Sequence, residues 1–543
     1  MSWQGTNFGV ALKALAQEIE ADRPALIHGD RVVSWSELDA VTDRIAAGLR
    51  KRGFKPGDIA GQMLRNSPDY MLAYFGCIKA GLSPINVNYH YKDRELRDIF
   101  HRFELKLVFV ESDFAEIAAA ALPTDAAIMD VGSAAWADLQ GTELPNEFSI
   151  HDDPGALFLT ATGGTTGMPK AVMWPFNEAW GAFSLSTWPR GFDQPPFVTT
   201  SLEEHAQEAG RIGLDHPLSG SPMLTLSPLM HGAGQFTSVL HLLKGGTVAL
   251  LPSAKFDADL AIAEAARIGA KTLLFVGDAF AIPLLDRIEA RPNGTQEIAS
   301  VRVIYSSGAV FSSANKDRFL AHNAQMAIID SLGSSEGSGA ALIITTAAGS
   351  TGGGKFQAIP GRETKLFDEA LEEVPMGSDR VGIVARTGPL PLGYLGDEAK
   401  SAETFPTIDG KRWLMTGDRA RWAADGSLEF IGRDNMCINT GGEKVFPEEV
   451  EAVLVGHGEV HDARVVSLPD ARFGRKVVAV IQPEMGGSLT QSDLETVLDS
   501  YTRKHLAGYK IPRQYVFTQQ TLRLNNGKAD YKSAQSLADQ AAS

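Results

Sequence analysis

Apolar residues recur with two different periods along most of the chain, and the alternation of these periods predicts an α/β fold. In RVVSWSELDAVTDRIAAGLRKRG a short apolar run is followed by apolar residues spaced three and four apart, which predicts a strand and then an amphipathic helix. Ser34 or Ser36 would cap this helix, and Gly53 would end it. SPDYMLAYFGCIKAGLSPINVN predicts a helix that leads into a strand, and the rhythm continues through residues 271–275 and 301–305. We therefore expect parallel sheets covered by helices.

The rhythm stops between residues 183 and 222. The sequence FSLSTWPRGFDQPPFVTTSLEEHAQEAGRIGLDHPLSGSP is rich in proline and glycine. These residues favour turns over regular elements. We expect this segment to be an excursion from the core.

The last part of the chain predicts a second, smaller domain of α+β type. FPEEVEAVLVGHGEV predicts a helix that begins at Pro447, and ARVVSLP and KVVAVIQP predict short strands. In LTQSDLETVLDSYTRKHL, Thr490 and Asp493 have the spacing of a capping box, and QYVFTQQ predicts a final strand. About 100 residues suffice for a separate domain. We expect the boundary near IGRDN, with one domain over residues 1–433 and another over residues 434–543.

Size and composition limit the function classes. A chain of 543 residues exceeds a single core, so about two to four domains are expected. The net charge of −16 argues against a general nucleic-acid-binding surface. Cys77 and Cys437 are too few for a disulfide framework. The first residues lack a signal-peptide pattern, and no apolar run approaches the roughly 18 residues of a membrane span. We expect a cytoplasmic protein without an integral membrane segment; a homodimer stays open.

The most informative motif is TGGTTGMPK, which runs from Thr162 to Lys170 between two apolar runs. Glycines allow successive N–H groups to point into one concavity that holds phosphate oxygens. The threonine hydroxyls add donors, and Lys170 adds positive charge. A flexible surface loop is the alternative, but Pro169 and the flanking apolar runs stiffen the segment.

Two hypotheses compete at GSSEG, residues 333–337. The pattern G-x-S-x-G is that of the nucleophile elbow of serine hydrolases, with Ser335 as the nucleophile. The later histidines, however, all fall in the small C-terminal part. Alternatively, Glu336 follows a predicted strand and could hold Mg²⁺. An isolated loop glutamate is more often simply exposed.

Three further residues gain meaning only together. His231 lies in SPLMHGAGQF, where small residues leave space for a pocket. Asp418 in LMTGDRARW follows a predicted strand and could bind ribose hydroxyls, or simply its own backbone. Lys528 in RLNNGKADYK would by itself be a solvated lysine.

These motifs occur in one order with fitting separations, and the ordered set resembles the adenylate-forming superfamily. The matching segments are TGGTTGMPK, PLMHGAG, SLGSSE, TGD, IGRDNMCINTGGEKVFPEEVE and NNGK. The resemblance covers nearly the whole chain, from residue 32 to Lys528, and is closest to bacterial acyl-CoA synthetases for fatty acids or steroid side chains. It implies the adenylate-forming fold with a mobile C-terminal domain.

The resemblance also implies roles for particular residues. It implies triphosphate contacts from Thr162, Thr165, Thr166, Gly167, Lys170 and Ser335, and Mg²⁺ binding by Glu336. It implies an adenine slot at Ser307, Gly308, Ala309 and Asp330, and ribose contacts from Asp418 and Arg433. Lys528 would bridge the substrate carboxylate and the α-phosphate, Gly441 and Gly442 would face the pantetheine tunnel, and Asp434 with Asn435 would form the hinge. Leu332 stands where an aromatic residue usually stacks on adenine.

The implied activity is a two-step ligation that uses ATP, Mg²⁺ and coenzyme A. A carboxylate attacks ATP to give acyl-AMP, and the thiol of coenzyme A then takes the acyl group. The acid pocket would comprise His231, Gly232, Ala233, Phe236, Val276, Gly277, Ala309 and Gly333. Amino-acid-activating relatives carry an aspartate at the position of Gly232, so we expect a hydrophobic acid: a medium- or long-chain fatty acid or a steroid-derived acid. An aromatic-acid CoA ligase, a serine hydrolase using Ser335 and a nucleotide-binding protein without ligase chemistry are the alternatives.

Overall fold

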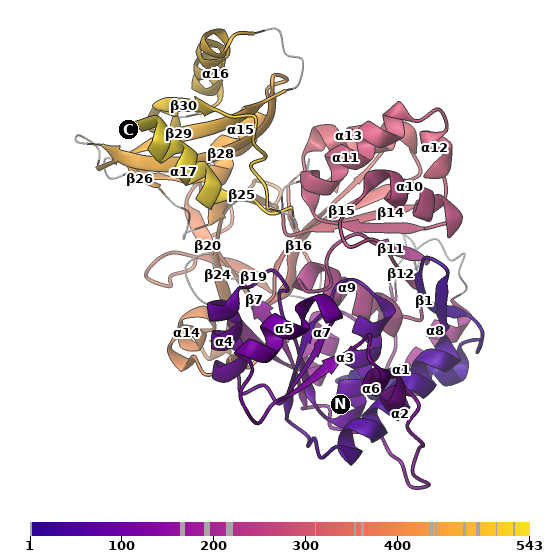
Figure 1. Cartoon of the computed structure of the whole chain (residues 1–543). Helices are drawn as coiled ribbons and strands as arrows, with labels where there is room; N and C mark the ends of the chain where they lie inside the picture. Colours follow the sequence, from indigo (N-terminus) through magenta and orange to yellow (C-terminus); the bar gives the residue numbers. More distant parts are fainter. Residues whose placement is uncertain are drawn as a thin grey trace. The chain divides into compact units, whose positions relative to one another are not determined.

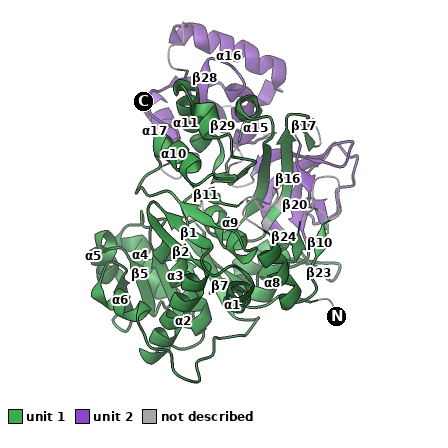
Figure 2. Ribbon diagram, turned by 90° about the vertical axis from the view of Figure 1, so that its right-hand side faces the viewer, with its two compact units in different colours: residues 1–354, 359–363, 387–414 green, residues 355–358, 364–386, 415–543 purple. Residues whose placement is uncertain are grey.

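The computed structural model divides the chain into two compact units, coloured separately in Figure 2. Unit 1 comprises residues 1–354, 359–363 and 387–414, and unit 2 comprises residues 355–358, 364–386 and 415–543. The structure describes residues 3–162, 169–188, 196–212, 221–309, 311–351, 355–359, 363–433, 436, 438–440, 443–470, 474–484, 489–506, 508–524 and 527–542. Residues 364–386 and 415–433 thus group with the C-terminal segment. The predicted domain boundary at 433/434 stays a prediction.

The first sheet of unit 1 is parallel over most of its width. Its strand order is β21-β8-β7-β4-β3-β5-β6. Strands β7, β4, β3, β5 and β6 pair in parallel, and β8 and β21 extend the sheet antiparallel at one edge. The bounds are β3 (Ile59–Met63), β4 (Ser83–Asn86), β5 (Leu107–Val110), β6 (Ala127–Asp130), β7 (Leu157–Thr162), β8 (Lys170–Pro175) and β21 (Gly393–Tyr394).

The second sheet of unit 1 has the order β17-β16-β15-β14-β13-β11-β12-β1-β2. Its central strands, from β1 to β15 along this order, pair in parallel, and β2, β16 and β17 are antiparallel additions at the edges. The bounds are β1 (Pro24–His28), β2 (Arg31–Ser34), β11 (Met223–Thr225), β12 (Val248–Leu250), β13 (Thr272–Phe275), β14 (Val303–Ser307), β15 (Ala327–Ser334), β16 (Ser338–Thr346) and β17 (Gly349–Ser350).

Helices cover these sheets, as Figure 1 shows, and the parallel α/β class expected from the sequence is confirmed. The covering helices are α1 (Phe8–Glu18), α2 (Trp35–Lys51), α3 (Pro68–Ala80), α4 (Asp93–Arg102), α5 (Ser112–Ala121), α6 (Ala134–Gln140), α7 (Phe176–Ala182), α9 (Gly232–Leu243), α10 (Ala258–Arg267), α11 (Gly277–Ala290), α12 (Gly294–Glu297), α13 (Ser313–His322) and α14 (Glu398–Thr404). Ser34 caps α2 by accepting from Glu37 N–H at 3.1 Å, so the first of the two predicted caps is the right one. One buried cluster joins helices α1, α2, α3 and α9 to strands of both sheets, and a second packs α10, α11 and α13 on the second sheet.

Among the residues that the structure describes, unit 2 holds two larger sheets, the two-stranded sheet β26–β27 and the predicted C-terminal helices. The first sheet has the order β19-β20-β24-β25, with β19 (Thr364–Phe367), β20 (Val381–Arg386), β24 (Leu414–Trp422) and β25 (Leu428–Arg433). The second comprises β28 (Val460–Asp470), β29 (Gly474–Pro483) and β30 (Gln514–Phe517). The remaining bounds are β26 (Ile438–Thr440), β27 (Glu443–Val445), α15 (Pro447–Val455), α16 (Gln491–His505) and α17 (Tyr531–Ala542).

Alternate side chains of β28 and β29 pack in two hydrophobic clusters, one on each face of the small sheet. Side chains such as Val465 and Val477 pack on one face against α15 and α16, whereas Val466 and Val478 pack on the other face against α17. Because successive side chains of a strand point to opposite faces, each strand is apolar on both sides and needs helices on both. Thr490 caps α16 through the N–H of Asp493, as the capping spacing predicted.

The prediction that residues 183–222 leave the core was wrong for their described part. This part holds β9 (Thr187–Trp188), β10 (Phe197–Val198) and α8 (Leu202–Arg211), and α8 packs beside α1. Trp188, His205 and Ala209 are buried. Ser201 caps α8 by accepting from Glu204 N–H at 3.1 Å. The prolines and glycines that flank the helix concealed this capped amphipathic pattern.

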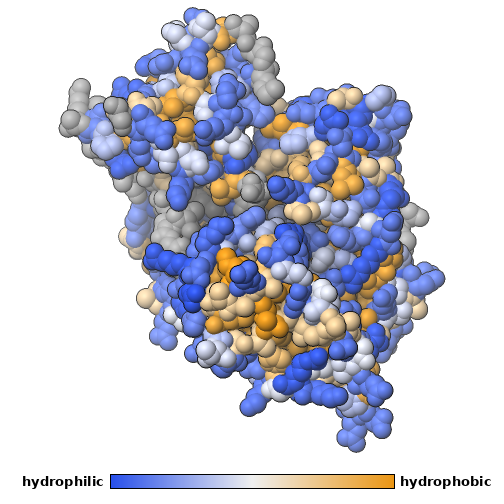
Figure 3. Space-filling view, viewed as in Figure 1, coloured by the Kyte–Doolittle hydropathy of each residue, from blue (hydrophilic) through white to orange (hydrophobic). Residues whose placement is uncertain are grey.

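The face in Figure 3 is mostly hydrophilic, in keeping with the charged composition, and an apolar area lies over α5. In α5, Ala119 and Ala120 are exposed. Among the described residues, none of the helices combines the length and the apolar character that a bilayer crossing needs.

Candidate active site

The predicted site residues of unit 1 cluster at the carboxyl ends of parallel strands. Strands β11, β13, β14 and β15 are neighbours in the second sheet. The segments that follow them carry His231, Gly277, Gly308 and Glu336, respectively. Because parallel strands end at one edge of a sheet, loops from distant parts of the sequence meet there, and this edge is where open α/β sheets bind ligands.

The two ends of the predicted phosphate loop face each other. Thr162 ends β7 and Lys170 begins β8, and the two residues are cross-strand partners in the antiparallel pair. The sheet therefore fixes the two ends of the predicted phosphate loop. Thr165, Thr166 and Gly167 lie outside the described residues, so their phosphate contacts stay predictions.

Lys170 and Glu336 meet at the same tyrosine. The Tyr394 hydroxyl donates to Glu336 Oε1 at 2.9 Å, and Lys170 Nζ lies 5.2 Å from the centre of the Tyr394 ring. Tyr394 is buried, and burial, with the negative charge of Glu336, raises its pKa well above the usual range. The phenol therefore stays protonated and donates. Tyr394 is thus a neighbour of two predicted site residues: Lys170, which is predicted to bind the triphosphate, and Glu336, which is predicted to bind Mg²⁺.

Ser335 lies in a turn, and this argues against a hydrolase. The turn joins the antiparallel strands β15 and β16, and Trp174 Nε1 donates to the Ser335 carbonyl at 2.9 Å. A nucleophile elbow requires a strand, a sharp turn and then a helix. Since a second strand follows Ser335 instead, the hydrolase alternative lacks its structural basis. The position suits the predicted phosphate contact beside Glu336.

The predicted adenine residues lie on β14 and β15. Ser307 Oγ donates to the Ser331 carbonyl at 3.0 Å, and Gly308 has a φ of +90° that favours glycine. Of the described residues, only Val276 would lie within 4 Å of a Cβ atom at Gly308, at 3.9 Å, so those residues leave space beside the backbone. Ala309 packs against the second core cluster.

Asp330 is a buried member of an ion pair. Lys316 Nζ donates to Asp330 Oδ2 at 2.8 Å, and both side chains are nearly inaccessible. Burial raises the pKa of Asp330, while Lys316 opposes this shift. The predicted contact of Asp330 with the adenine amino group stays a prediction; the ion pair fixes where that carboxylate lies.

The predicted acid pocket begins at the N-terminus of α9. His231 is the residue before the helix, and Gly232 and Ala233 form its first turn. A Cβ atom at Gly232 would lie 3.2 Å from Ser335 Oγ and 3.4 Å from the Phe236 ring. This places the predicted acid-binding and phosphate-binding segments in contact. Phe236 itself packs on Phe158 and Phe183 within the core.

The other predicted pocket residues lie on neighbouring strand ends. Val276 precedes α11 and is buried, and Gly277 has a φ of +54° and donates its N–H to Ser306 Oγ at 3.0 Å. Gly333 pairs with Gly339 across the β15–β16 hairpin, where the register shifts. Leu332 is half-buried beside it on β15.

In unit 2, the two predicted ribose residues are cross-strand partners. Asp418 on β24 pairs with Arg433 on β25, and Thr416 donates to Asp418 Oδ2 at 2.6 Å. The predicted hinge residues Asp434 and Asn435, and the predicted pantetheine-facing Gly441 and Gly442, lie outside the described residues.

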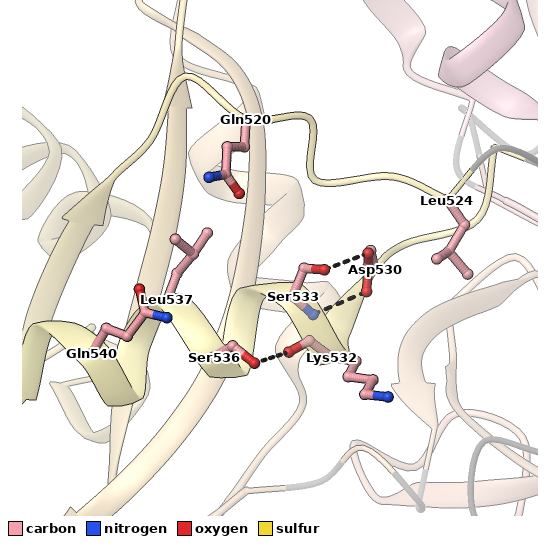
Figure 4. Close-up of a pocket in the computed structure, with 8 residues that line it drawn as sticks. All are labelled: Gln520, Leu524, Asp530, Lys532, Ser533, Ser536, Leu537 and Gln540. Carbon is pink, nitrogen blue, oxygen red and sulfur yellow. Dashed lines mark hydrogen bonds between the residues drawn. The ribbon is translucent and has the colours of Figure 1, made fainter.

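Lys528 lies in a short hairpin. Its carbonyl accepts from Leu524 N–H at 2.8 Å, and Arg523 and Ala529 form a β-bridge. Residues on both sides of Lys528, most of them on α17, line an open groove of about 420 Å³ (Figure 4). The groove is lined mainly by polar side chains, and Asp530 is engaged by the N–H and hydroxyl of Ser533. This lining does not suit a hydrophobic acid.

Sequence reasoning missed residues that support this site. Tyr394, Trp174 and Asn86 all contact predicted site segments. Each lies far along the sequence from the group that it contacts, and no local pattern marks it. The short motif GYLG around Tyr394 was the nearest available signal.

Two family profiles match the chain. The AMP-binding enzyme family matches residues 14–395, and the AMP-binding enzyme C-terminal domain matches residues 449–528. The chain belongs to the AMP-binding enzyme family. The predicted family is thereby confirmed over both of its parts.

Relatives of this AMP-binding enzyme carry names of CoA ligases. It is 34% identical to a medium/long-chain-fatty-acid–CoA/3-oxocholest-4-en-26-oate–CoA ligase of Mycolicibacterium smegmatis, over 96% of this chain and 94% of the relative. It is 33% identical to a 3-oxocholest-4-en-26-oate–CoA ligase of Rhodococcus rhodochrous, with the same coverage of both chains. In fold it resembles an anthranilate CoA ligase solved in complex with anthranoyl-AMP (TM-score 0.79, 21% identity, 98% of both chains).

Proposed function

We propose that this AMP-binding enzyme is an ATP-dependent acyl-CoA synthetase for a hydrophobic carboxylic acid of medium or long chain, or for an acid with a steroid skeleton. The observation that carries the proposal is full-length similarity to ligases named for such acids. The site adds a physical argument. Gly232 contributes no charge where the acid would bind, and the Phe236 ring lies beside it. Val276, another residue of the predicted pocket, is apolar and buried. A buried ammonium or second carboxylate would find no partner among these residues.

The charged groups of unit 1 suit the first step. In this step a carboxylate oxygen of the acid forms a bond to the α-phosphorus of ATP, and the bond from that phosphorus to the bridging oxygen breaks to release pyrophosphate. Lys170 and the N–H groups of the phosphate loop would hold the leaving group. Lys528 would offset the repulsion between the acid and the α-phosphate.

The carboxylate of Glu336 is suited to bind Mg²⁺. Its carboxylate is held at one oxygen by Tyr394, and carboxylate oxygens are ligands that Mg²⁺ prefers. Mg²⁺ commonly takes one or two carboxylates together with substrate phosphates, so a single acidic residue suffices. When bound, the ion would neutralise phosphate charge. The hydrogen bond from Tyr394 would orient the Glu336 carboxylate for this ion.

In the second step the thiolate of coenzyme A attacks the acyl carbon, and AMP leaves. We propose that residues 434–543 move between the two steps, with Asp434 and Asn435 as the hinge. Gly441 and Gly442 would then line the path of the pantetheine arm.

The test is pyrophosphate exchange with the purified full-length protein. Acids from acetate to palmitate, a benzoate and a 3-oxosteroid acid with a carboxylated side chain are supplied with ATP and Mg²⁺, and acyl-AMP is identified by mass spectrometry. We expect exchange with octanoate or longer acids or with the steroid acid. Exchange with benzoate alone would favour the aromatic-acid alternative, and no exchange with any acid would overturn the proposal.

Two variants separate the ligase from the other classes. Lys528→Ala should lose acyl-AMP formation and keep its thermal unfolding midpoint. Ser335→Ala should weaken ATP binding. Any background ester hydrolysis should be the same in this variant as in wild type. Hydrolysis that needs Ser335 and ignores Lys528 would support the hydrolase instead.

A further inference from the structure

Residues 227–231, which connect β11 to α9, are held by side chains from outside their own sheet. Asn66 donates to the Ser227 carbonyl at 2.9 Å and accepts from Leu229 N–H at 2.7 Å. The Tyr70 hydroxyl donates to the Leu229 carbonyl at 3.0 Å. Asn66 follows β3 of the first sheet and Tyr70 lies on α3, so both residues precede the groups that they contact by about 160 positions. The connection that leads to His231 thus has its backbone groups satisfied by fixed partners.

Asn86 makes the most informative contacts of this group. Its Nδ2 donates to the Met230 carbonyl at 2.5 Å and to the Ala161 carbonyl at 3.3 Å, and its Oδ1 accepts from Ala161 N–H at 2.8 Å. Asn86 ends β4 and is 2% exposed. Its amide therefore continues the β4–β7 ladder where the β4 backbone ends, and at the same time binds the residue before His231.

Asn86 joins a segment that is predicted to bind phosphate to a segment that is predicted to bind the acid. Ala161 precedes Thr162 at the start of the predicted phosphate loop, and Met230 precedes His231 at the predicted acid pocket. In the proposed reaction, the separation between these segments would set the distance between the α-phosphorus and the attacking carboxylate. A misplacement of about 1 Å can lower a rate about 100-fold.

We propose that Asn86 is a positioning residue for adenylation, which fixes the acid-binding connection 227–231 against the phosphate loop through one buried amide. The inference rests on the proposed function. A buried amide with every contact used is also costly to remove for stability alone, so the test must separate placement from folding.

Asn7 offers a matched control. It is a fully buried asparagine of unit 1 that likewise accepts, from Gly9 N–H at 2.8 Å, and donates, to the Asp153 carbonyl at 3.2 Å. It contacts neither predicted substrate segment in these bonds. Asn7→Ala should therefore lower the unfolding midpoint much as Asn86→Ala does, without slowing chemistry in the folded fraction.

Single-turnover formation of acyl-AMP is measured for wild type, Asn86→Ala, Asn86→Asp and Asn7→Ala, each normalised to folded protein. We expect Asn86→Ala to be about 10- to 100-fold slower at saturating ATP and acid. Asn86→Asp keeps the acceptor for Ala161 but donates to Met230 only when its carboxyl is protonated, and burial raises the pKa of such a carboxyl. Its rate relative to wild type should therefore rise as pH falls from 8 to 6, whereas that of Asn7→Ala stays flat.

The outcomes are distinct. Equal rates for Asn86→Ala and Asn7→Ala, or a relative rate of Asn86→Asp that ignores pH, would show that Asn86 serves folding only and overturn the inference while the proposed function stands. A wild-type protein that forms no acyl-AMP would overturn the proposed function, and the inference with it.

Discussion

The Tyr394 hydroxyl lies 2.9 Å from Glu336 Oε1 and donates a hydrogen bond to it. Tyr394 belongs to the first sheet of unit 1, through its pairing with β8, whereas Glu336 follows β15 of the second. The bond therefore ties the two sheets together at the predicted metal residue. Because the pKa of Tyr394 is raised by burial and by the neighbouring carboxylate, the bond persists across the pH range of ordinary assays.

Tyr394→Phe should raise the Mg²⁺ concentration that gives half-maximal adenylation and lower the rate about 10-fold. Bonds to charged groups contribute about 1.5–3 kcal/mol, and loss of this bond frees the carboxylate to turn. Magnesium titration of pyrophosphate exchange measures the effect. Tyr531→Phe is the control, since the Tyr531 hydroxyl donates to Glu451 Oε2 at 3.1 Å in unit 2. An equal magnesium shift in both variants would contradict a role for Tyr394 at the metal site.

Lys316→Met should destabilise the protein by about 3–5 kcal/mol at pH 8, because it leaves the buried Asp330 without its partner. Burial already raises the pKa of Asp330 above its unfolded value. A raised carboxyl pKa means that the folded state binds the proton more tightly, so stability is lost as pH rises. The deficit of Lys316→Met should therefore shrink as pH falls from 8 to 5.

Thermal unfolding at several pH values measures this deficit. Lys106→Met is the control, because Lys106 Nζ pairs with Asp125 at 2.7 Å on the surface. It should leave the midpoint unchanged. A pH-independent deficit for Lys316→Met would show that lost packing, and not the unpaired carboxylate, dominates.

Stability of unit 1 should decrease as pH falls from about 6.5 towards 4. His205 is fully buried among Trp3, Trp180 and Trp188, and its Nε2 bonds to the Leu243 carbonyl at 2.7 Å. The pKa of His205 is lowered to about 4, mainly by burial; the hydrogen bond to the Leu243 carbonyl opposes this shift, and the charge of Lys244 adds to it. The unfolded chain then binds the proton more readily, at about 1.4 kcal/mol per pH unit below the unfolded pKa.

His205→Gln should reduce this acid sensitivity, since glutamine keeps a donor and does not titrate. Some dependence of stability on pH should remain in this variant, because burial also lowers the pKa of His241 to about 4. Unfolding midpoints between pH 7.5 and 4.5 provide the comparison. Parallel curves for wild type and His205→Gln would show that the acid sensitivity arises elsewhere.

The sequence predicted the elements well where each one carries its own periodic pattern. Helix α3 and strand β4 follow directly from SPDYMLAYFGCIKAGLSPINVN, and the C-terminal elements follow from alternation and capping. Helix α8 was missed because its capped pattern is short and lies between proline- and glycine-rich stretches. Local periodicity thus predicts elements, and flanking breakers can hide them.

The sequence predicts the motifs of the candidate site, and their substrate contacts stay predictions. Thr162 and Lys170 lie in a motif whose residue types and spacing indicate phosphate binding, and Glu336 takes its predicted metal role from the family resemblance. Asn86 and Lys316 carry no such signal, because a buried amide or ion pair acquires its role only from partners that the fold brings together. Such long-range contacts leave no periodic trace in one sequence.

Two glycines at the start of α9 should respond very differently to alanine. A Cβ at Gly234 would lie 2.4 Å from the Pro228 carbonyl oxygen and 3.0 Å from that of Ser227, both backbone atoms of the connection 227–231. A Cβ at Gly232 would lie 3.2 Å from the Ser335 hydroxyl, which can rotate away. Gly234→Ala should therefore lose about 1–3 kcal/mol or more, whereas Gly232→Ala should fold nearly as well as wild type.

The activities of the two variants should differ in kind. Gly232→Ala narrows the space beside the predicted phosphate contact, so its kcat/KM should fall more for a long or polycyclic acid than for butyrate. Gly234→Ala moves the connection that carries His231, so all acids should suffer alike. An acid panel with each variant measures both ratios. A uniform loss in Gly232→Ala would place the acid pocket away from the start of α9, because a methyl group there discriminates among acids only if the acid passes beside it.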